Sequence, residues 1–129
     1  MKPVLGSMGM IPATREFLQA LRDAATANGI ILIFDEVISL RINHGGAQRF
    51  FGVTPDLTCM GKIIGGGLPV GGVGGRTDLM QLFSPDSPSP VVHASTFSGN
   101  ALTMSAGLPA MQAFNEDECN RINVLADRL

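Results

Sequence analysis

Apolar residues recur with a helical period between Thr14 and Asn28. At about 3.6 residues per turn, one face of such a helix carries Phe17, Leu18, Leu21, Ala24 and Ala25. Gly29 follows at the position where helices commonly end. The next run, Ile30 to Phe34, is apolar without alternation, which is typical of a strand covered on both faces. A helix that leads into such a strand predicts an α/β fold with a parallel sheet.

The pattern turns polar after Phe34, and the glycine-containing segment up to Gly52 predicts a long loop at the carboxyl edge of the sheet. Short strands are predicted for DLTCM, residues 56–60, and for PVGGV, residues 69–73. A glycine-rich loop separates these two strands.

The C-terminal part of the chain predicts three helices. Residues 77–83 form the first, with Thr77 as N-cap, and the proline- and serine-rich residues 84–90 form a loop. A second helix is expected from Asn100 to about Phe114, with a kink at Pro109 unless that proline begins a new turn. The acidic sequence NEDE then opens a last helix, where its charges suit the helix dipole.

These elements supply three strands, which are too few to cover both faces of a parallel sheet and to protect its edges. Neither a repeat nor a linker divides the 129 residues. We therefore expect residues 1–129 to be one incomplete α/β domain, a piece of a larger domain with a mostly parallel sheet flanked by helices.

Composition excludes several classes of function. With 9 basic and 11 acidic residues and a net charge of -2, the chain has no basic run for nucleic acid or an anionic membrane surface. No apolar run approaches the roughly 20 residues of a membrane span, and a signal peptide core is missing, so a cytoplasmic location is expected. Cys59 and Cys119 lie far apart without further ligands at metal-site spacing, which predicts two reduced structural thiols and no metal.

Asp35 is a candidate functional residue because it follows an apolar strand at the carboxyl edge of the predicted sheet, where ligands of open α/β sheets bind. A carboxylate at this place can hold a positive ring nitrogen. It can equally be a solvated loop acid or a helix N-cap. Its neighbour Glu36 points to the opposite side of an extended backbone and is expected to form at most a salt bridge.

Lys62 is the second candidate, and Lys2 is the chain's other lysine. Its neighbours are Met60, Gly61, Ile63 and Ile64. Such an apolar, glycine-rich turn should exclude water and favour the neutral amine that Schiff-base chemistry requires. The alternative is a surface lysine that extends its charge into solvent.

The glycines of this loop do not form a nucleotide motif. A P-loop requires glycine six residues before the lysine and Ser or Thr after it, whereas Asp56 and Ile63 occupy these positions. The spacing G-x-G-x-x-G is also missing from the loop. The glycines are better suited to tight turning and close backbone approach.

The sequence HASTFSGNAL, residues 93–102, offers hydroxyl and amide groups just before a helix, from Ser95, Thr96, Ser98 and Asn100. Such a helix start can hold a phosphate. Ordinary capping by Ser98 or Asn100 explains the same residues. His44 and His93 have no partners at a recognisable spacing and are expected to be polar loop residues.

Three stretches in a fixed order resemble class III pyridoxal-phosphate-dependent aminotransferases, and most closely their glutamate-1-semialdehyde aminomutase-like branch. They are LIFDEV, GGAQRFFGVTPDLTCMGKIIGGGLPVGGVGGR and TFSGNALTMSAGL. The resemblance extends from about Val4 to Phe114. The sequence departs from the family in DEVISLR, where a glycine is missing and Arg41 comes one position early, and in Ala101, where proline is usual.

The resemblance implies a fold-type I large domain that binds pyridoxal 5'-phosphate. Lys62 would form the Schiff base with the cofactor aldehyde and move the substrate proton. Asp35 would pair with the pyridine nitrogen, and Val37 would pack against the ring. Thr96 would bind the cofactor phosphate of the neighbouring subunit, so the active site would require a homodimer.

The implied reaction is transamination or amino-group migration on a small amino acid, amine or amino aldehyde, with the aminomutase-like members favoured. The family's upstream phosphate-binding loop and C-terminal small domain lie outside this sequence. An alternative is therefore a non-catalytic truncated remnant that serves as an oligomerisation or partner-binding piece. A mononucleotide binder is a third hypothesis, which the failed phosphate motifs weaken.

Overall fold

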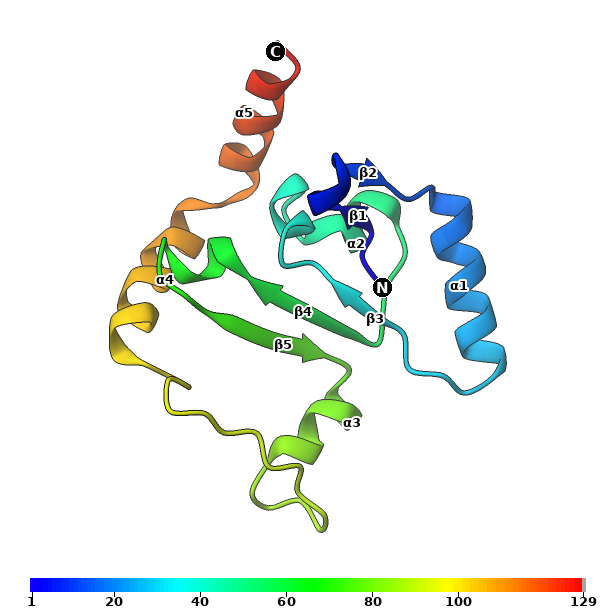
Figure 1. Ribbon diagram of the computed structural model, residues 1–129, viewed down its shortest axis with the longest axis vertical. Helices are drawn as coiled ribbons and strands as arrows, with labels where there is room; N and C mark the ends of the chain where they lie inside the picture. The colour runs from blue at the N-terminus through cyan, green and yellow to red at the C-terminus, as the bar shows by residue number, and fades with distance from the viewer. Residues whose placement is uncertain (129) are drawn as a thin grey trace.

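The computed structural model describes residues 1–128 and is built around a three-stranded sheet (Figure 1). The strand order is β3 (Ile33–Asp35), β4 (Leu57–Gly61) and β5 (Gly71–Gly75). Strands β3 and β4 pair in parallel, whereas β5 runs antiparallel to β4. The predicted α/β class is confirmed. The predicted parallel pairing is found between β3 and β4.

The N-terminal segment flanks the sheet beside β3. A small antiparallel pair, β1 (Val4–Leu5) and β2 (Ile11–Pro12), precedes the first helix. The backbone of Met1 continues the sheet, because its amino group donates to Ile33 O at 2.6 Å and its carbonyl accepts from the Asp35 amide at 2.7 Å.

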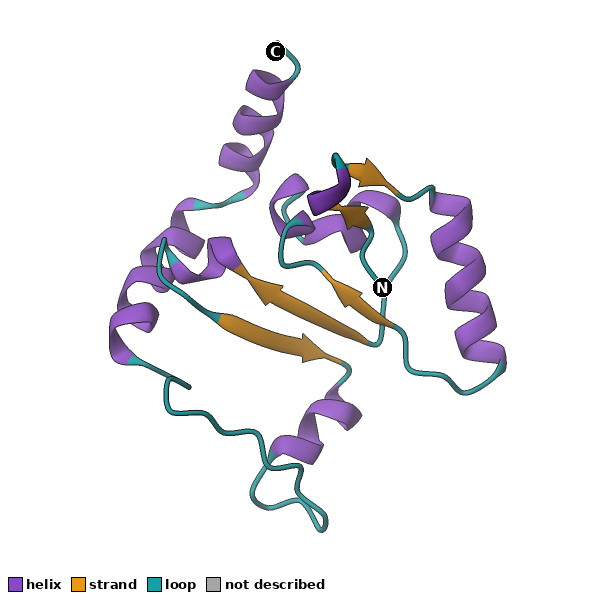
Figure 2. Ribbon diagram, in the orientation of Figure 1, coloured by secondary structure: helices purple, strands orange, loops and turns teal. Residues whose placement is uncertain are grey.

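Helix α1 (Arg15–Ala27) forms where the periodicity predicts it and lies beside the β3 end of the sheet (Figure 2). The Thr14 hydroxyl caps it by accepting the Phe17 amide at 3.2 Å. Its apolar face meets the sheet in a core of Leu18, Phe34 and Val53, with Ala13, Leu32 and Phe51 packed around them. Truncation of a buried side chain of this size typically costs about 2–5 kcal/mol.

The strand predicted for Ile30 to Phe34 is shorter in the structure and is covered on one face. The Ile30 amide donates to Ala25 O, and the Leu32 amide donates to the Asp56 carboxylate, so neither belongs to the sheet ladder. Ile30 is 60% exposed and Ile33 is 40% exposed, whereas Phe34 is fully buried. The expectation that this strand is covered on both faces is therefore wrong for the described residues, because the side of Phe34 is buried and the side of Ile33 is exposed.

The long loop predicted up to Gly52 contains two helical segments. A 3₁₀ helix (Ser39–Ile42) and helix α2 (Gly46–Phe51) lie between β3 and β4. Gly45 and Gly52 flank α2 with φ of +107° and +67°, a region that favours glycine. The loop prediction failed because the helix depends on these turns and on the buried carboxylate of Glu36, directly after β3.

The C-terminal part is helical, as predicted. Arg76 and not Thr77 occupies the N-cap position of the first helix, since Thr77 already has helical geometry. Asn100 caps the next helix, which continues through Pro109, and Asn115 caps the last. The elements are α3 (Thr77–Met80), a 3₁₀ helix (Gln81–Phe83), α4 (Ala101–Ala113) and α5 (Glu116–Ala126). Within residues 1–128, no helix is both long and apolar enough to cross a bilayer.

Candidate functional site

Two candidate residues lie at the same edge of the sheet. Strand β3 ends at Asp35, and β4 ends at Gly61, immediately before Lys62. These strands are parallel, with Asp35 paired to Cys59, so their carboxyl ends meet at one edge. The topology thus brings a carboxylate and a primary amine, 27 positions apart in sequence, to the place where open α/β sheets bind ligands.

Asp35 is half-buried and has few partners. One carboxylate oxygen accepts the Val37 amide at 3.2 Å. The other lies 3.5 Å from Lys2 Nζ, in a pair whose side chains are 48% and 35% exposed. An ion pair this exposed contributes little to stability, so the carboxylate can exchange this partner for another cation at low cost.

Val37 packs against the backbone that carries Lys62. A Cβ placed on Gly61 would lie 3.3 Å from Val37 Cγ1 and 3.2 Å from Val70 O. Glycine at position 61 therefore allows the valine to approach the residue before the lysine. The backbone positions of Asp35, Val37 and Lys62 therefore lie in one cluster at the adjacent ends of β3 and β4.

Lys62 begins a 3₁₀ helix (Lys62–Gly65) and has a φ of +51°, the left-handed region that side-chain-bearing residues rarely adopt. Its side chain is exposed. The expectation that apolar neighbours would remove it from water is wrong for the described chain. Ile64 instead packs toward Gly72 of β5, so hydrophobic neighbours in sequence do not enclose the amine.

Thr96 lies apart from this cluster in an exposed turn of residues 96–99, directly before α4. The adjacent hydroxyls of Ser95 and Ser98 are 3.1 Å apart, and Asn100 caps the helix by accepting the Thr103 amide at 3.2 Å. The hydrogen bonds found among residues 1–128 do not connect Thr96 with Asp35 or Lys62.

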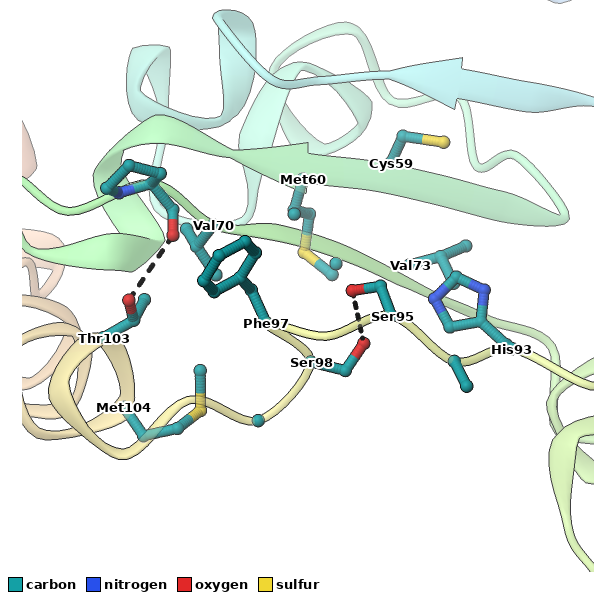
Figure 3. Close-up of a pocket in the computed structure, with 15 residues that line it drawn as sticks. Cys59, Met60, Val70, Val73, His93, Ser95, Phe97, Ser98, Thr103 and Met104 are labelled. Atoms are coloured by element: carbon teal, nitrogen blue, oxygen red, sulfur yellow. Dashed lines mark hydrogen bonds between the residues drawn. The ribbon is translucent and has the colours of Figure 1, made fainter.

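A depression of about 730 Å³ lies between β5, the segment 93–99 and the start of α4 (Figure 3). Met60, His93, Phe97 and Met104 are among the residues that line it, whereas the four candidate residues do not. We therefore place the candidate site at the adjacent ends of β3 and β4, where Asp35 and Lys62 are found, and not in this depression.

The comparison with known families decides what this arrangement belongs to. The sequence profile described as aminotransferase class-III matches residues 1–129. The chain belongs to this family. The resemblance noted from the sequence motifs is thereby confirmed.

Relatives in the class III family cover nearly all of the chain. It is 54% identical over 117 residues to the glutamate-1-semialdehyde 2,1-aminomutase of Desulfotalea psychrophila. The aligned residues make up 90% of this chain and 27% of that protein. Another similar protein is the glutamate-1-semialdehyde 2,1-aminomutase 2 of Bacillus licheniformis, 45% identical over 129 residues, or 99% of this chain and 30% of that protein. The chain thus spans less than a third of the length of these curated relatives.

Solved structures of transaminases share the fold. An omega-transaminase from Sphaerobacter thermophilus is 51% identical with a TM-score of 0.93, over 98% of this chain and 29% of that one. A structure described as a transaminase with PLP bound is 36% identical with a TM-score of 0.92, over 98% of this chain and 30% of that one. The α/β arrangement of residues 1–128 is therefore part of the fold-type I architecture of class III enzymes.

Glu36 also differs from its predicted role in this class III chain, because within residues 1–128 it forms hydrogen bonds and not a salt bridge. It is completely buried and makes no salt bridge within the described residues. Its carboxylate accepts the amides of Ala47 and Gln48, the Ser39 hydroxyl at 3.3 Å and Gln48 Nε2 at 3.3 Å. Because α2 provides most of these donors, the anion fixes the backbone between Asp35 and Val37.

Gln48 extends this network to the strand that leads to the lysine. Its Nε2 also donates to Thr58 Oγ1 at 3.2 Å, and Thr58 is buried within β4. No local sequence signal predicts α2, and hence none predicts the donors that surround the Glu36 carboxylate.

Asp56 is a second buried carboxylate, at the start of β4 and so at the edge away from Lys62. It accepts Arg22 Nη1 and Arg76 Nη1, each at 2.8 Å, and the Leu32 amide at 2.7 Å. Hydrogen bonds from Arg76, Leu32 and Arg22 lower the pKa of this carboxyl well below its ordinary value of 3.8. This ionic cluster joins α1 to the residue before β3 and to the residue after β5, and it is structural.

The Asp56 cluster should make stability depend on pH in acid. Because the folded-state pKa of Asp56 is lowered, its contribution is complete above the ordinary value of 3.8 and is lost as pH falls below it. We expect Asp56→Asn to reduce the free energy of unfolding at pH 7 by about 2 kcal/mol. Below about pH 4, the free energy of unfolding of this variant should fall less steeply with pH than that of the unsubstituted protein.

Urea unfolding between pH 7 and pH 2.5 measures both effects, with the exposed Asp86→Asn as the matched control. Parallel acid profiles for Asp56→Asn and the unsubstituted protein would contradict this account.

Proposed function

We propose that this chain carries the cofactor-binding core of a pyridoxal-phosphate-dependent aminotransferase or aminomutase that acts on a small amino acid or amino aldehyde. The carrying observation is the cluster at the sheet edge, where Asp35 ends β3, Lys62 follows β4 and Val37 lies close to Gly61, the residue before the lysine. Family membership and the names of the relatives support the same reaction class. Residues 1–129 would be an incomplete large domain.

The residues present fit pyridoxal phosphate. A carboxylate with an exchangeable partner suits a protonated ring nitrogen, an exposed primary amine suits an aldehyde, and a branched apolar side chain suits a ring face. A carboxylate, an amine and an apolar side chain are the three kinds of group that suit the cofactor's ring. They stand at or just after the ends of two adjacent parallel strands.

When bound, pyridoxal phosphate supplies an electron sink for the negative charge left by deprotonation of the substrate carbon. Asp35 would accept the ring N–H in place of Lys2 and keep that nitrogen protonated. The Lys62 nitrogen would hold the aldehyde carbon at rest until the substrate amine replaces it there. The freed Lys62 amine would then take a proton from the substrate carbon and return it at the former aldehyde carbon. Val37 would exclude water from one side of the ring.

We place Thr96 in the active site of a second copy of the chain, where its hydroxyl would bind the cofactor phosphate. The turn that carries Thr96 is exposed, and α4 begins directly after it. Large apolar side chains around this turn and on α4 are exposed as well, including Val92 at 89%, Phe97, Leu102 and Leu108. A homodimer would cover this apolar surface.

The test is reductive trapping of the cofactor. Purified protein is mixed with pyridoxal phosphate, its visible spectrum is recorded, borohydride is added, and the labelled peptide is mapped. The lysine nitrogen bonds to the aldehyde carbon with loss of water, and borohydride then delivers hydride to that carbon. We expect one label, on Lys62. Label scattered onto Lys2, or no label, would support the non-catalytic alternative instead.

A second assay separates the two reactions that the relatives' names suggest. An aminomutase moves the amino group within one amino aldehyde and needs no separate acceptor, whereas a transaminase needs an amino donor and a keto acceptor. The 54% identical relative is named an aminomutase and the 51% identical structure an omega-transaminase, so the names alone favour neither. Product formation from glutamate-1-semialdehyde without an added acceptor would select the aminomutase.

A further inference from the structure

Lys62 has an unfavourable backbone conformation, so the surrounding structure must hold it in place. Its φ of +51° lies in the left-handed region, where a residue with a Cβ is strained unless its neighbours fix it. The loop that follows, residues 62–70, connects β4 to β5 and has two turn hydrogen bonds, from the Gly66 amide to Ile63 O at 3.2 Å and from the Leu68 amide to Gly65 O at 3.1 Å. These bonds alone do not anchor the loop to the rest of the protein.

Helix α4 provides that anchor through direct backbone contact. A Cβ on Gly107 would collide with the carbonyl oxygen of Ile64, two residues after the lysine. From the other side, a Cβ on Gly66 would collide with the carbonyl oxygen of Ala106. The loop and α4 therefore touch backbone to backbone at Gly66 and at Gly107. No side chain lies between these two segments that could change its rotamer to relieve a clash.

One turn earlier on the same face of α4, Thr103 makes a polar contact with the end of the loop. Thr103 is buried, and its hydroxyl donates to Pro69 O at 3.4 Å (Figure 3). The loop that carries Lys62 is thus held against α4 at Ile64, at Gly66 and at Pro69. A shift of α4 by the width of one methyl group would move the loop, because each contact is with backbone atoms.

We infer that Gly107 is a positioning residue for Lys62. Its missing side chain lets α4 press the Ile64 carbonyl into place, which maintains the left-handed backbone at Lys62 and the direction of its amine. The inference rests on the proposed role of Lys62 toward pyridoxal phosphate. Intrinsic helix propensity argues for alanine inside a helix, so glycine at this position has a reason in packing.

The test compares Gly107→Ala with Gly71→Ala. Gly71 lies in β5 opposite Gly61, and a Cβ there would meet no atom within 4 Å, so it is a matched glycine-to-alanine control near the same loop. The rate of pyridoxal phosphate capture on Lys62 is measured by borohydride trapping and peptide mapping. We expect Gly107→Ala to slow capture by roughly tenfold or more, since small misplacements of a reacting group have effects of this size. Gly71→Ala should stay within about twofold.

Gly66→Ala and Thr103→Val test two other points of the packing between α4 and the loop. Because Gly66 has a φ of +60°, alanine at this position is also strained by its own backbone. Gly66→Ala should give a similar loss, and combining it with Gly107→Ala should add little, because one substitution already opens the contact. Thr103→Val removes the hydroxyl at constant shape and should slow capture more than Thr103→Ser, which keeps it. These two Thr103 variants decide the matter if Gly107→Ala does not fold.

Capture at the unsubstituted rate by a folded Gly107→Ala protein would overturn the inference. If the unsubstituted protein itself captures nothing on Lys62, the proposed function fails, and the positioning role is judged by hydrogen exchange without cofactor. Faster exchange of the amides in residues 62–68 in Gly107→Ala, but not in Gly71→Ala, would then support it. Equal exchange in all three proteins would refute it.

Discussion

Lys62→Ala is expected to abolish cofactor trapping and turnover while leaving a folded protein. The expectation rests on the Lys62 amine as the group that bonds to the aldehyde, because Asp35 and Val37 have no nucleophilic nitrogen and the Lys2 amine is paired with the Asp35 carboxylate at 3.5 Å. Stability should change little, since the Lys62 side chain is exposed and alanine carries the same Cβ through the left-handed backbone. Circular dichroism and thermal unfolding check the fold, and reduced-peptide mapping checks the trapping.

Lys62→Arg is the matched control. Arginine keeps the positive charge and the length, but its guanidinium stays protonated and does not form the bond to the aldehyde. We expect it to behave like Lys62→Ala in trapping and turnover. A Lys62→Arg protein that retained turnover would show that charge at this position, and not covalent chemistry, carries the function.

Glu36→Ala is expected to cause the largest loss of stability, lowering the free energy of unfolding by about 3 kcal/mol or more. The substitution leaves the amides of Ala47 and Gln48 without their buried acceptor, and each unsatisfied group costs about 1–3 kcal/mol. It also removes the hydrogen bonds from the Ser39 hydroxyl and from Gln48 Nε2. Urea unfolding monitored by circular dichroism measures the change.

Glu16→Ala serves as the control, because Glu16 lies exposed in the first turn of α1 and should cost less than about 1 kcal/mol. Glu36→Gln should lower the free energy of unfolding by an amount between those of Glu36→Ala and Glu16→Ala. Glutamine keeps one oxygen acceptor, and an NH₂ group replaces the other. If Glu36→Ala cost no more than Glu16→Ala, the buried carboxylate would not be what holds α2 against β3.

Local signals were sufficient to predict the long helices of this chain. The period of α1 and the cap at Asn100 are determined by nearby residues, and both hold in the structure, although only Leu18 and Ala25 of the predicted apolar face are buried and Phe17 is 53% exposed. The position of Asp35 at a strand end could also be predicted, because an apolar run that ends in a carboxylate marks that edge.

Contacts between distant segments could not be predicted in the same way. Helix α2 depends on the Glu36 anion, and the late start of β3 depends on Asp56, which takes the Leu32 amide 24 residues away. Neither acceptor differs in sequence from an ordinary surface acid. The exposure of Lys62 has the same origin, since the direction of a side chain is set by the turn and not by the hydrophobicity of its neighbours.

Strand β5 is the outer strand of the described sheet, and Val73 is the sole residue with a side chain among its five positions. It carries neither the charges nor the proline with which edge strands usually discourage pairing with another chain. The practical consequence concerns handling of the protein. Samples of this chain should be kept dilute and examined by light scattering before spectroscopy, because aggregation through this edge would scatter light in the same range as a cofactor absorbance band.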